Sequence, residues 1–284
     1  MLQSMKLGML VLMASLLAAC SSLPESQSVR VEGMPMVYNK QGQGSPTIVL
    51  EAGLGDDMTS WREVIQPLSS VSTVFAYNRA GYAPSGSRDR SREPAQVVED
   101  LHKLLGNAGL KPPYILVGHS LGGVYMLDFA QRYPEEVAGL VLIDTRHPLF
   151  SQTCESRGVS SCYLSEPLRL LLPSHVRREY DDAQSGRPPA SLGSMPLVVV
   201  SRTPMQGSGS KQWHRLWQEM QRDLAELSVN SRLIVAKDSG HYVHKQEPAR
   251  LLEAIEWVMS SPKSKRVGLT EWVPGGFRPK AQGY

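Results

Sequence analysis

A serine lies in a glycine-rich turn at residues 118–123, which read GHSLGG. The turn follows the apolar run YILVG (114–118) and precedes a helix-like segment that stops before Pro134. A sharp turn from a strand into a helix is strained, and it lifts a serine hydroxyl clear of the sheet beside the positive end of the helix. Ser120 is therefore the candidate nucleophile, and a plain glycine–serine turn is the alternative.

A serine hydroxyl needs a base to take its proton. Of the seven histidines, His241 is the best placed, because it follows the apolar run at 232–236 in a glycine-containing loop. Such loops open at the carboxyl ends of strands, where α/β sheets build their sites. His244 is the second candidate. We predict no metal site at these two histidines, because no third ligand has suitable spacing.

A carboxylate must hold the histidine tautomer and stabilise the imidazolium. Asp144 is the first choice, because it ends the apolar run GLVLID (139–144) and would emerge at the same sheet edge as Ser120. Glu219, Asp223 and Asp238 are alternatives, and so is a site without an acid.

The elements that must position these residues alternate along the chain from Val29 onward. A hairpin with its turn near Gly33 opens the pattern. Strands are predicted at 47–51, 71–78, 114–118, 139–144, 197–201 and 232–236, and helices at 61–68, 94–105, 121–133, 213–227 and 248–259. Short apolar runs, each followed by a helix, indicate a mostly parallel central sheet with helices on both faces.

The sequence resembles the α/β-hydrolase-fold serine hydrolases, a family that includes esterases and lipases. The similar segments are GHSLGG with the following helix and strand (118–144), EAGLGDDMTSW (51–61), YNRAGYAPSG (77–86) and SGHYVHKQEP (239–248). The resemblance covers about residues 47–147 and 196–259. Ala52 and Asn78 depart from the family pattern, which usually has His and Asp there.

The resemblance implies an oxyanion hole formed by the backbone N–H groups of Leu54 and Leu121, and it implies no cofactor. In this family the acid usually follows the penultimate strand, but here no Asp or Glu lies between Ser201 and Gln218. Some members carry the acid after the preceding strand, which here ends in Asp144. The expected activity is hydrolysis of carboxylic esters or related acyl compounds. A lipase or acyltransferase, a haloperoxidase-like enzyme and a non-catalytic binding protein are the alternatives.

The chain divides into a core at 29–145 and 196–260, interrupted by an insertion at 146–195. This connection is long for two neighbouring strands, so we interpret it as a cap over the active-site end of the sheet. It contains Cys154 and Cys162, which in an exported protein would form a disulfide; two free thiols are the alternative. Residues 261–284 form a basic tail.

The N-terminus indicates export. Residues 7–19 are apolar but too few to span a bilayer, and they end in LLAACSS. This resembles a bacterial lipoprotein signal, which implies a signal peptide at 1–19, lipidation of Cys20 and a tether at 20–28. We expect a lipid anchor in the outer membrane, facing the periplasm; an uncleaved anchor is the alternative.

Composition excludes other classes of protein. Hydrophobic residues make up 41% of the chain, enough for a sizeable core. The net charge of +3, from 30 basic and 27 acidic residues, gives no support for a nucleic-acid partner. The expected partner is a small-molecule or lipid acyl substrate, and the sequence does not determine the oligomeric state.

Overall fold

The computed structural model describes residues 23–87, 91–160, 162–184, 186–203 and 210–261. The signal peptide (1–19), Cys20 and all of the basic tail except Ser261 lie outside these residues. So do residues 204–209, which follow the predicted strand 197–201 in the sequence. Within the described residues, none of the helices is long and apolar enough to cross a membrane.

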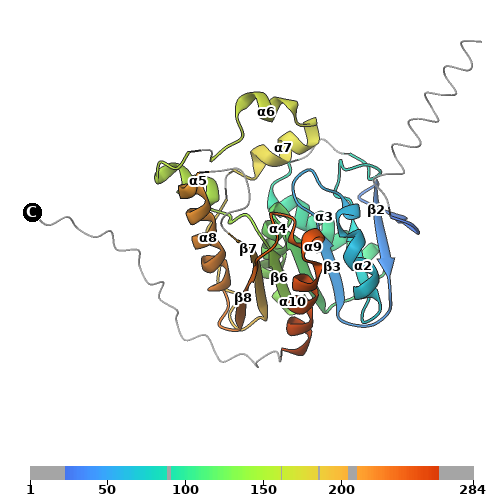
Figure 1. Ribbon diagram of the computed structural model, residues 1–284. Coiled ribbons are helices and arrows are strands. Elements are labelled where there is room, and N and C mark those ends of the chain that lie inside the picture. The colour runs from blue at the N-terminus through green and yellow to red at the C-terminus, as the bar shows by residue number, and fades with distance from the viewer. Residues whose placement is uncertain (1–22, 88–90, 161, 185, 204–209, 262–284) are drawn as a thin grey trace, which may run out of the picture.

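An eight-stranded sheet forms the centre of the protein (Figure 1). Its strands, in chain order, are β1 (Gln27–Val31), β2 (Met34–Gln41), β3 (Thr47–Glu51), β4 (Val74–Tyr77), β5 (Tyr114–His119), β6 (Val137–Ile143), β7 (Leu197–Arg202) and β8 (Ser231–Ala236). They lie in the order β1-β2-β4-β3-β5-β6-β7-β8. The first two strands are antiparallel to their neighbours and the other six run parallel. The predicted mostly parallel sheet is confirmed.

The β1–β2 hairpin turns at Glu32 and Gly33, whose φ angles are 48° and 82°. Two consecutive positive φ angles are those of a type I′ turn, which matches the twist of antiparallel strands. The predicted opening hairpin is therefore present.

Helices cover both faces of the sheet. On one face lie α3 (Pro94–Asn107), α4 (Leu121–Arg132) and α8 (Lys211–Ala225), and on the other α2 (Arg62–Ser69), α9 (Val243–Gln246) and α10 (Pro248–Ser260). Short 3-10 helices, η2 (Met58–Trp61) and η3 (Pro134–Glu136), precede α2 and β6. Along β5, Leu116 packs into one core while Ile115 and Val117 pack into the other. Because each face meets its own helices, the strand needs apolar residues at every position.

Three further helices lie between β6 and β7, within the predicted cap: α5 (Phe150–Ser156), α6 (Glu166–Leu171) and α7 (Ser174–Asp182). Figure 1 shows α6 and α7 stacked above one end of the sheet. That end is the carboxyl one, because Glu179 of α7 contacts Arg79 and Tyr82, which follow β4. A disulfide joins Cys154 of α5 to Cys162 just beyond it.

Candidate active site

Ser120 stands between β5 and α4 with φ 53° and ψ −118°. This conformation is rare for a residue with a side chain and stores about 1–3 kcal/mol of strain. Close backbone packing makes the glycines around it necessary. A β-carbon on Gly118 would lie 2.5 Å from the Gly123 α-carbon, and one on Gly122 would lie 2.5 Å from the carbonyl oxygen of Ala52. The sequence motif therefore forms the predicted strained turn.

The loop after β3 lies directly against this turn. A β-carbon added to Gly53 would be 3.3 Å from the β-carbon of Ser120, so the backbone leading into Leu54 borders the serine. Leu121 is the first residue of α4, where a backbone N–H has no acceptor within the helix. The fold thus brings the segments that carry both predicted oxyanion donors to Ser120.

His241 and Asp144 meet although 97 residues separate them. The Nδ1 atom of His241 lies 2.6 Å from Oδ2 of Asp144. Asp144 is fully buried, whereas 32% of the His241 side chain is exposed. The backbone of Asp144 has a positive φ of 39°, and its N–H donates to the carbonyl of Val200 on β7 at 2.7 Å. With Nδ1 directed at the carboxylate, Nε2 is the nitrogen left to exchange a proton with a substrate or nucleophile.

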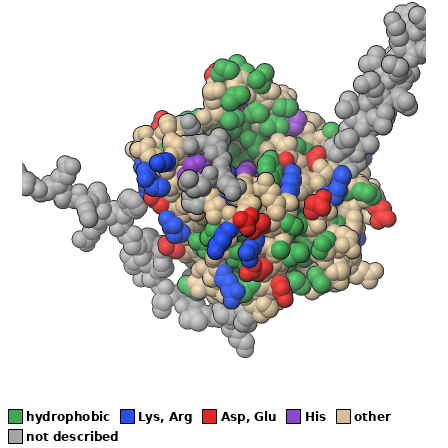
Figure 2. Space-filling view, viewed as in Figure 1, with side chains coloured by type: hydrophobic (Ala, Val, Ile, Leu, Met, Phe, Trp, Pro, Cys, Tyr) green, Lys and Arg blue, Asp and Glu red, His purple; other side chains and the backbone are tan. Residues whose placement is uncertain are grey.

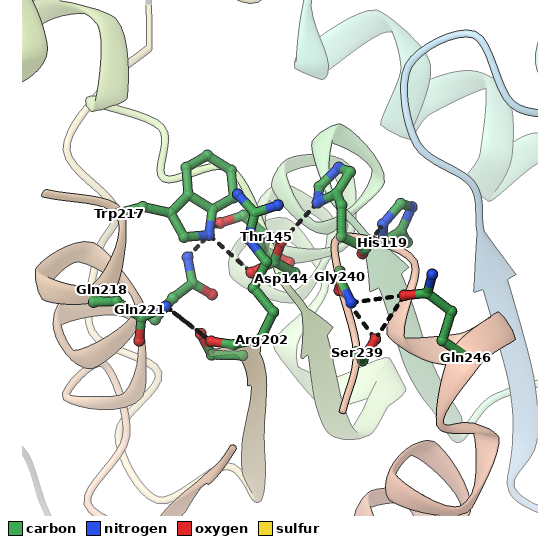
Figure 3. Close-up of polar contacts among 12 residues, drawn as sticks. His119, Asp144, Thr145, Arg202, Trp217, Gln218, Gln221, Ser239, Gly240 and Gln246 are labelled. Atoms are coloured by element: carbon green, nitrogen blue, oxygen red, sulfur yellow. Dashed lines mark hydrogen bonds and ion pairs between the residues drawn. The ribbon is translucent and has the colours of Figure 1, made fainter. Parts of the chain in front are cut away.

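Two side chains that the sequence analysis did not assign to the site also contact Asp144 (Figure 3). The indole Nε1–H of Trp217 donates to Oδ1 at 2.8 Å, and Nε of Arg202 lies 3.3 Å from Oδ2. Trp217 is a buried residue of the helix predicted at 213–227, so only its N–H group indicated a second role. Arg202 ends β7, beside the place where the family usually carries its acid. At that place the Arg202 guanidinium contacts the carboxylate of Asp144, which follows the neighbouring strand β6.

The three alternative acids lie on the surface. Glu219 is 45% exposed and pairs with Arg157 at 2.5 Å. Asp223 is exposed on α8, and Asp238 is exposed near the start of the His241 loop, where its N–H donates to Glu247. Asp144 is therefore the acid that the fold places against His241.

His244, the alternative base, is almost fully buried in the wall beside the site. Its ring centroid lies 4.4 Å from that of Trp61. Burial, assisted by the nearby Lys245 charge, lowers the pKa of His244 to about 3, so the ring is neutral. This environment suits a packed core residue rather than a proton carrier.

His119 has a supporting position next to the serine. Burial holds its pKa well below the ordinary histidine value, so it is neutral at physiological pH. Its Nε2 lies 2.9 Å from the carbonyl oxygen of His241, and an oxygen acceptor requires the proton on that nitrogen. His119 thereby ties the loop of His241 to the turn of Ser120.

No metal centre is formed by the part of the chain that the structure describes: it contains no group of three or more His, Cys, Asp or Glu side chains arranged to hold an ion. The remaining histidines have other surroundings. His102 stacks on Tyr133, His175 contacts Tyr82 edge-on, His214 lies beside Trp213, and Nδ1 of His147 accepts the N–H of Leu149.

Known proteins share this architecture. Residues 46–160 match a family model described as the alpha/beta hydrolase fold. The uncharacterized protein YqjL of Bacillus subtilis is 28% identical over 214 residues, which is 74% of this chain and 82% of that protein.

Similar solved structures have several activities. A membrane phospholipase A, described as a bacterial virulence factor, is 20% identical with a TM-score of 0.65 and covers 92% of this chain and 97% of its own. A thermophilic esterase from Thermogutta terrifontis is 20% identical with a TM-score of 0.63, covering 83% and 98%. The epoxide hydrolase CorEH is 18% identical with a TM-score of 0.59, covering 82% and 98%. Sheet order, helix layers and these similarities agree: the chain has the α/β-hydrolase fold.

Proposed function

We propose that the protein is a serine hydrolase that cleaves carboxylic esters or related acyl compounds. One observation carries this proposal: a buried carboxylate, Asp144, holds Nδ1 of His241 at 2.6 Å beside the strained turn of Ser120. A histidine oriented in this way is the base that a serine nucleophile requires.

The proposed reaction has two halves. His241 takes the proton of Ser120 as the hydroxyl oxygen attacks the acyl carbon, and the negative oxygen that forms accepts from the N–H groups of Leu54 and Leu121. His241 then gives the proton to the leaving alcohol, which leaves an acyl group on Ser120. A water molecule, deprotonated by His241, attacks that acyl group, and His241 returns the proton to the oxygen of Ser120 as the acid leaves. Asp144 stabilises the imidazolium that forms in each half.

The fold alone does not choose among activities, because esterases and epoxide hydrolases share it. The residue at the turn favours acyl chemistry, since a serine with a histidine base forms acyl-enzymes.

Labelling of Ser120 with a fluorophosphonate tests the proposal, with Ser120→Ala as the control. We expect stoichiometric labelling of the natural protein and turnover of p-nitrophenyl acetate or butyrate, both abolished in the variant. A well-folded protein that resists the label and leaves the esters intact would instead be a binding protein with a hydrolase fold.

A lipid or long-chain acyl substrate is the second candidate. Four leucines of the cap are exposed to solvent: Leu164 (38%), Leu168 (55%), Leu170 (57%) and Leu171 (79%). Figure 2 shows hydrophobic side chains gathered at the end of the molecule where the cap lies. An apolar surface of this kind suits contact with acyl chains. The ratio of turnover for twelve-carbon and two-carbon p-nitrophenyl esters separates the candidates, and adding an alcohol acceptor reveals acyl transfer.

We further propose that the protein is exported and lipid-anchored at Cys20. The LLAACSS segment supports this, and the disulfide at Cys154 is consistent with an oxidising compartment. Mass spectrometry of the N-terminal peptide of membrane-extracted protein should find a lipid on Cys20. An unmodified Cys20, or an intact residue 1–19 segment on the mature protein, would exclude the anchor.

A further inference from the structure

Glu179 is a carboxylate from the cap that lies inside the core. It belongs to α7 and is 0% exposed. Its carboxylate pairs with Nε of Arg79 at 2.8 Å and accepts hydrogen bonds from the hydroxyls of Tyr82 and Tyr125. These partners follow β4 or belong to α4, so a single cap side chain joins three parts of the fold.

Two of these partners, Arg79 and Tyr82, bind the loop after β3 that carries Leu54. Arg79 donates from Nη1 to the carbonyl of Ala52 at 2.7 Å and from Nη2 to the carbonyl of Gly53 at 2.8 Å. The hydroxyl oxygen of Tyr82 accepts the N–H of Gly55 at 3.0 Å. The backbone is therefore fixed on both sides of Leu54, whose N–H is a proposed oxyanion donor.

The orientation of both partners depends on Glu179. A tyrosine hydroxyl can donate one hydrogen bond. Because Tyr82 donates to Glu179, a lone pair of its hydroxyl oxygen is directed to the N–H of Gly55. Arg79 is buried and needs a negative charge nearby. Glu51 lies 2.7 Å from Arg79, but burial raises the pKa of Glu51 to about 7. Glu51 is therefore only partly ionised at neutral pH, and Glu179 is the second carboxylate in contact with the Arg79 guanidinium.

We propose that Glu179 is a positioning residue for the oxyanion hole: seating of cap helix α7 orders the loop around Leu54 through Arg79 and Tyr82. The position of the cap then controls how well the hole stabilises the transition state. Displacement of α7 would disorder the backbone N–H of Leu54. The catalytic half of this inference rests on the proposed ester hydrolysis, whereas the coupling of cap and loop does not.

The first test compares Glu179→Gln with Asp182→Asn in the full-length protein. Asp182 lies on the same helix and accepts the backbone N–H of Arg92 at 2.6 Å, so it also joins cap to core, but through Arg92 rather than through Arg79 or Tyr82. Hydrogen exchange of the peptide that covers residues 52–56 should speed up at least tenfold in Glu179→Gln and stay within about twofold in Asp182→Asn. Equal protection in both variants would overturn the coupling.

The second measurement is steady-state hydrolysis of p-nitrophenyl butyrate. Removal of an oxyanion donor costs about 10²–10³ in rate, so a misplaced donor should lower kcat by about 10- to 100-fold. KM should change little, because the ground-state ester does not need the hole. A rise in KM with kcat unchanged in Glu179→Gln would refute the positioning role. An equal loss of kcat in Asp182→Asn would also refute it.

Tyr82→Phe provides an independent variant if Glu179→Gln does not fold. It removes the acceptor of the Gly55 N–H and keeps the pair between Arg79 and Glu179, and it should show the same faster loop exchange and lower kcat. If the natural protein neither reacts with a fluorophosphonate nor hydrolyses the ester, the proposed function fails. The exchange comparison then still decides the coupling.

Discussion

Replacement of Asp144 by asparagine tests the contact between the Asp144 carboxylate and His241. The change keeps the size of the side chain but removes its charge. The charges of Asp144 and a protonated His241 are centred about 4 Å apart, and such a pair contributes about 4 kcal/mol at an effective dielectric constant of 20. Since about 1.4 kcal/mol is tenfold in rate, loss of this term alone lowers kcat by about 10³.

The hydrogen bonds around Asp144 increase the effect. The carboxylate accepts from Trp217 at 2.8 Å and from His241 at 2.6 Å, but an asparagine has only one oxygen. If the amide NH₂ faces His241, the ring takes the tautomer that cannot accept the serine proton. If the NH₂ faces Trp217, a buried N–H loses its acceptor at a cost of about 1–3 kcal/mol. Together these terms predict a fall in kcat of about 10³–10⁴.

The assay is kcat for p-nitrophenyl butyrate, with the melting temperature measured on the same samples. Asp223→Asn makes the identical chemical change at an exposed position and should stay within about twofold of the natural rate. A folded Asp144→Asn protein with more than a tenth of the natural kcat would refute the reasoning, as would a large loss in Asp223→Asn or Glu219→Gln.

Three further predictions concern residues around the site. Trp217→Phe removes one hydrogen bond to the Asp144 carboxylate, a charged acceptor, and should lower kcat by about 10- to 100-fold without a comparable rise in KM. His244 has its pKa lowered by burial from 6.5 to about 3, so the unfolded chain binds the extra proton first and stability is lost as pH falls below about 6.5. For this residue the loss between pH 7.5 and pH 5 is about 2 kcal/mol, and urea unfolding of His244→Leu should show a correspondingly flatter pH dependence. The Cys154–Cys162 disulfide closes a short loop, so Cys154→Ser with Cys162→Ser should cost about 2–3 kcal/mol of cap stability, seen as a lower melting temperature; an unchanged melting temperature would contradict this.

Local sequence was sufficient to predict the strands, the helices and the strained turn of Ser120. The turn of Ser120 is encoded within six residues, GHSLGG. Apolar runs that lack alternation predict strands buried on both faces. Strand and helix positions agree with the structure to within a few residues. The strand expected at 71–78 is shorter, at Val74–Tyr77, because the residues before it form a turn after α2.

Long-range packing determines which side chains contact His241 and Asp144. Asp144 was favoured by strand order, but the sequence left Glu219, Asp223 and Asp238 open, since contact with His241 depends on how β6 and β8 are placed around β7. The supporting roles of Trp217 and Arg202 carried no motif, because a tryptophan in an apolar stripe and an arginine at a strand end have many uses.

The cap is the clearest case of a contact that local sequence does not predict. Its sequence predicted an insertion over the sheet, and nothing in it singled out Glu179. That residue matters only because the fold buries it against Arg79 and Tyr82, nearly a hundred residues earlier in the chain. By itself, the sequence determined which segments form strands and helices and where the serine turn lies, since these depend on neighbours in the chain. Tertiary structure decided which carboxylate reaches which cation or histidine, because charges pair through space once burial has removed water from around them.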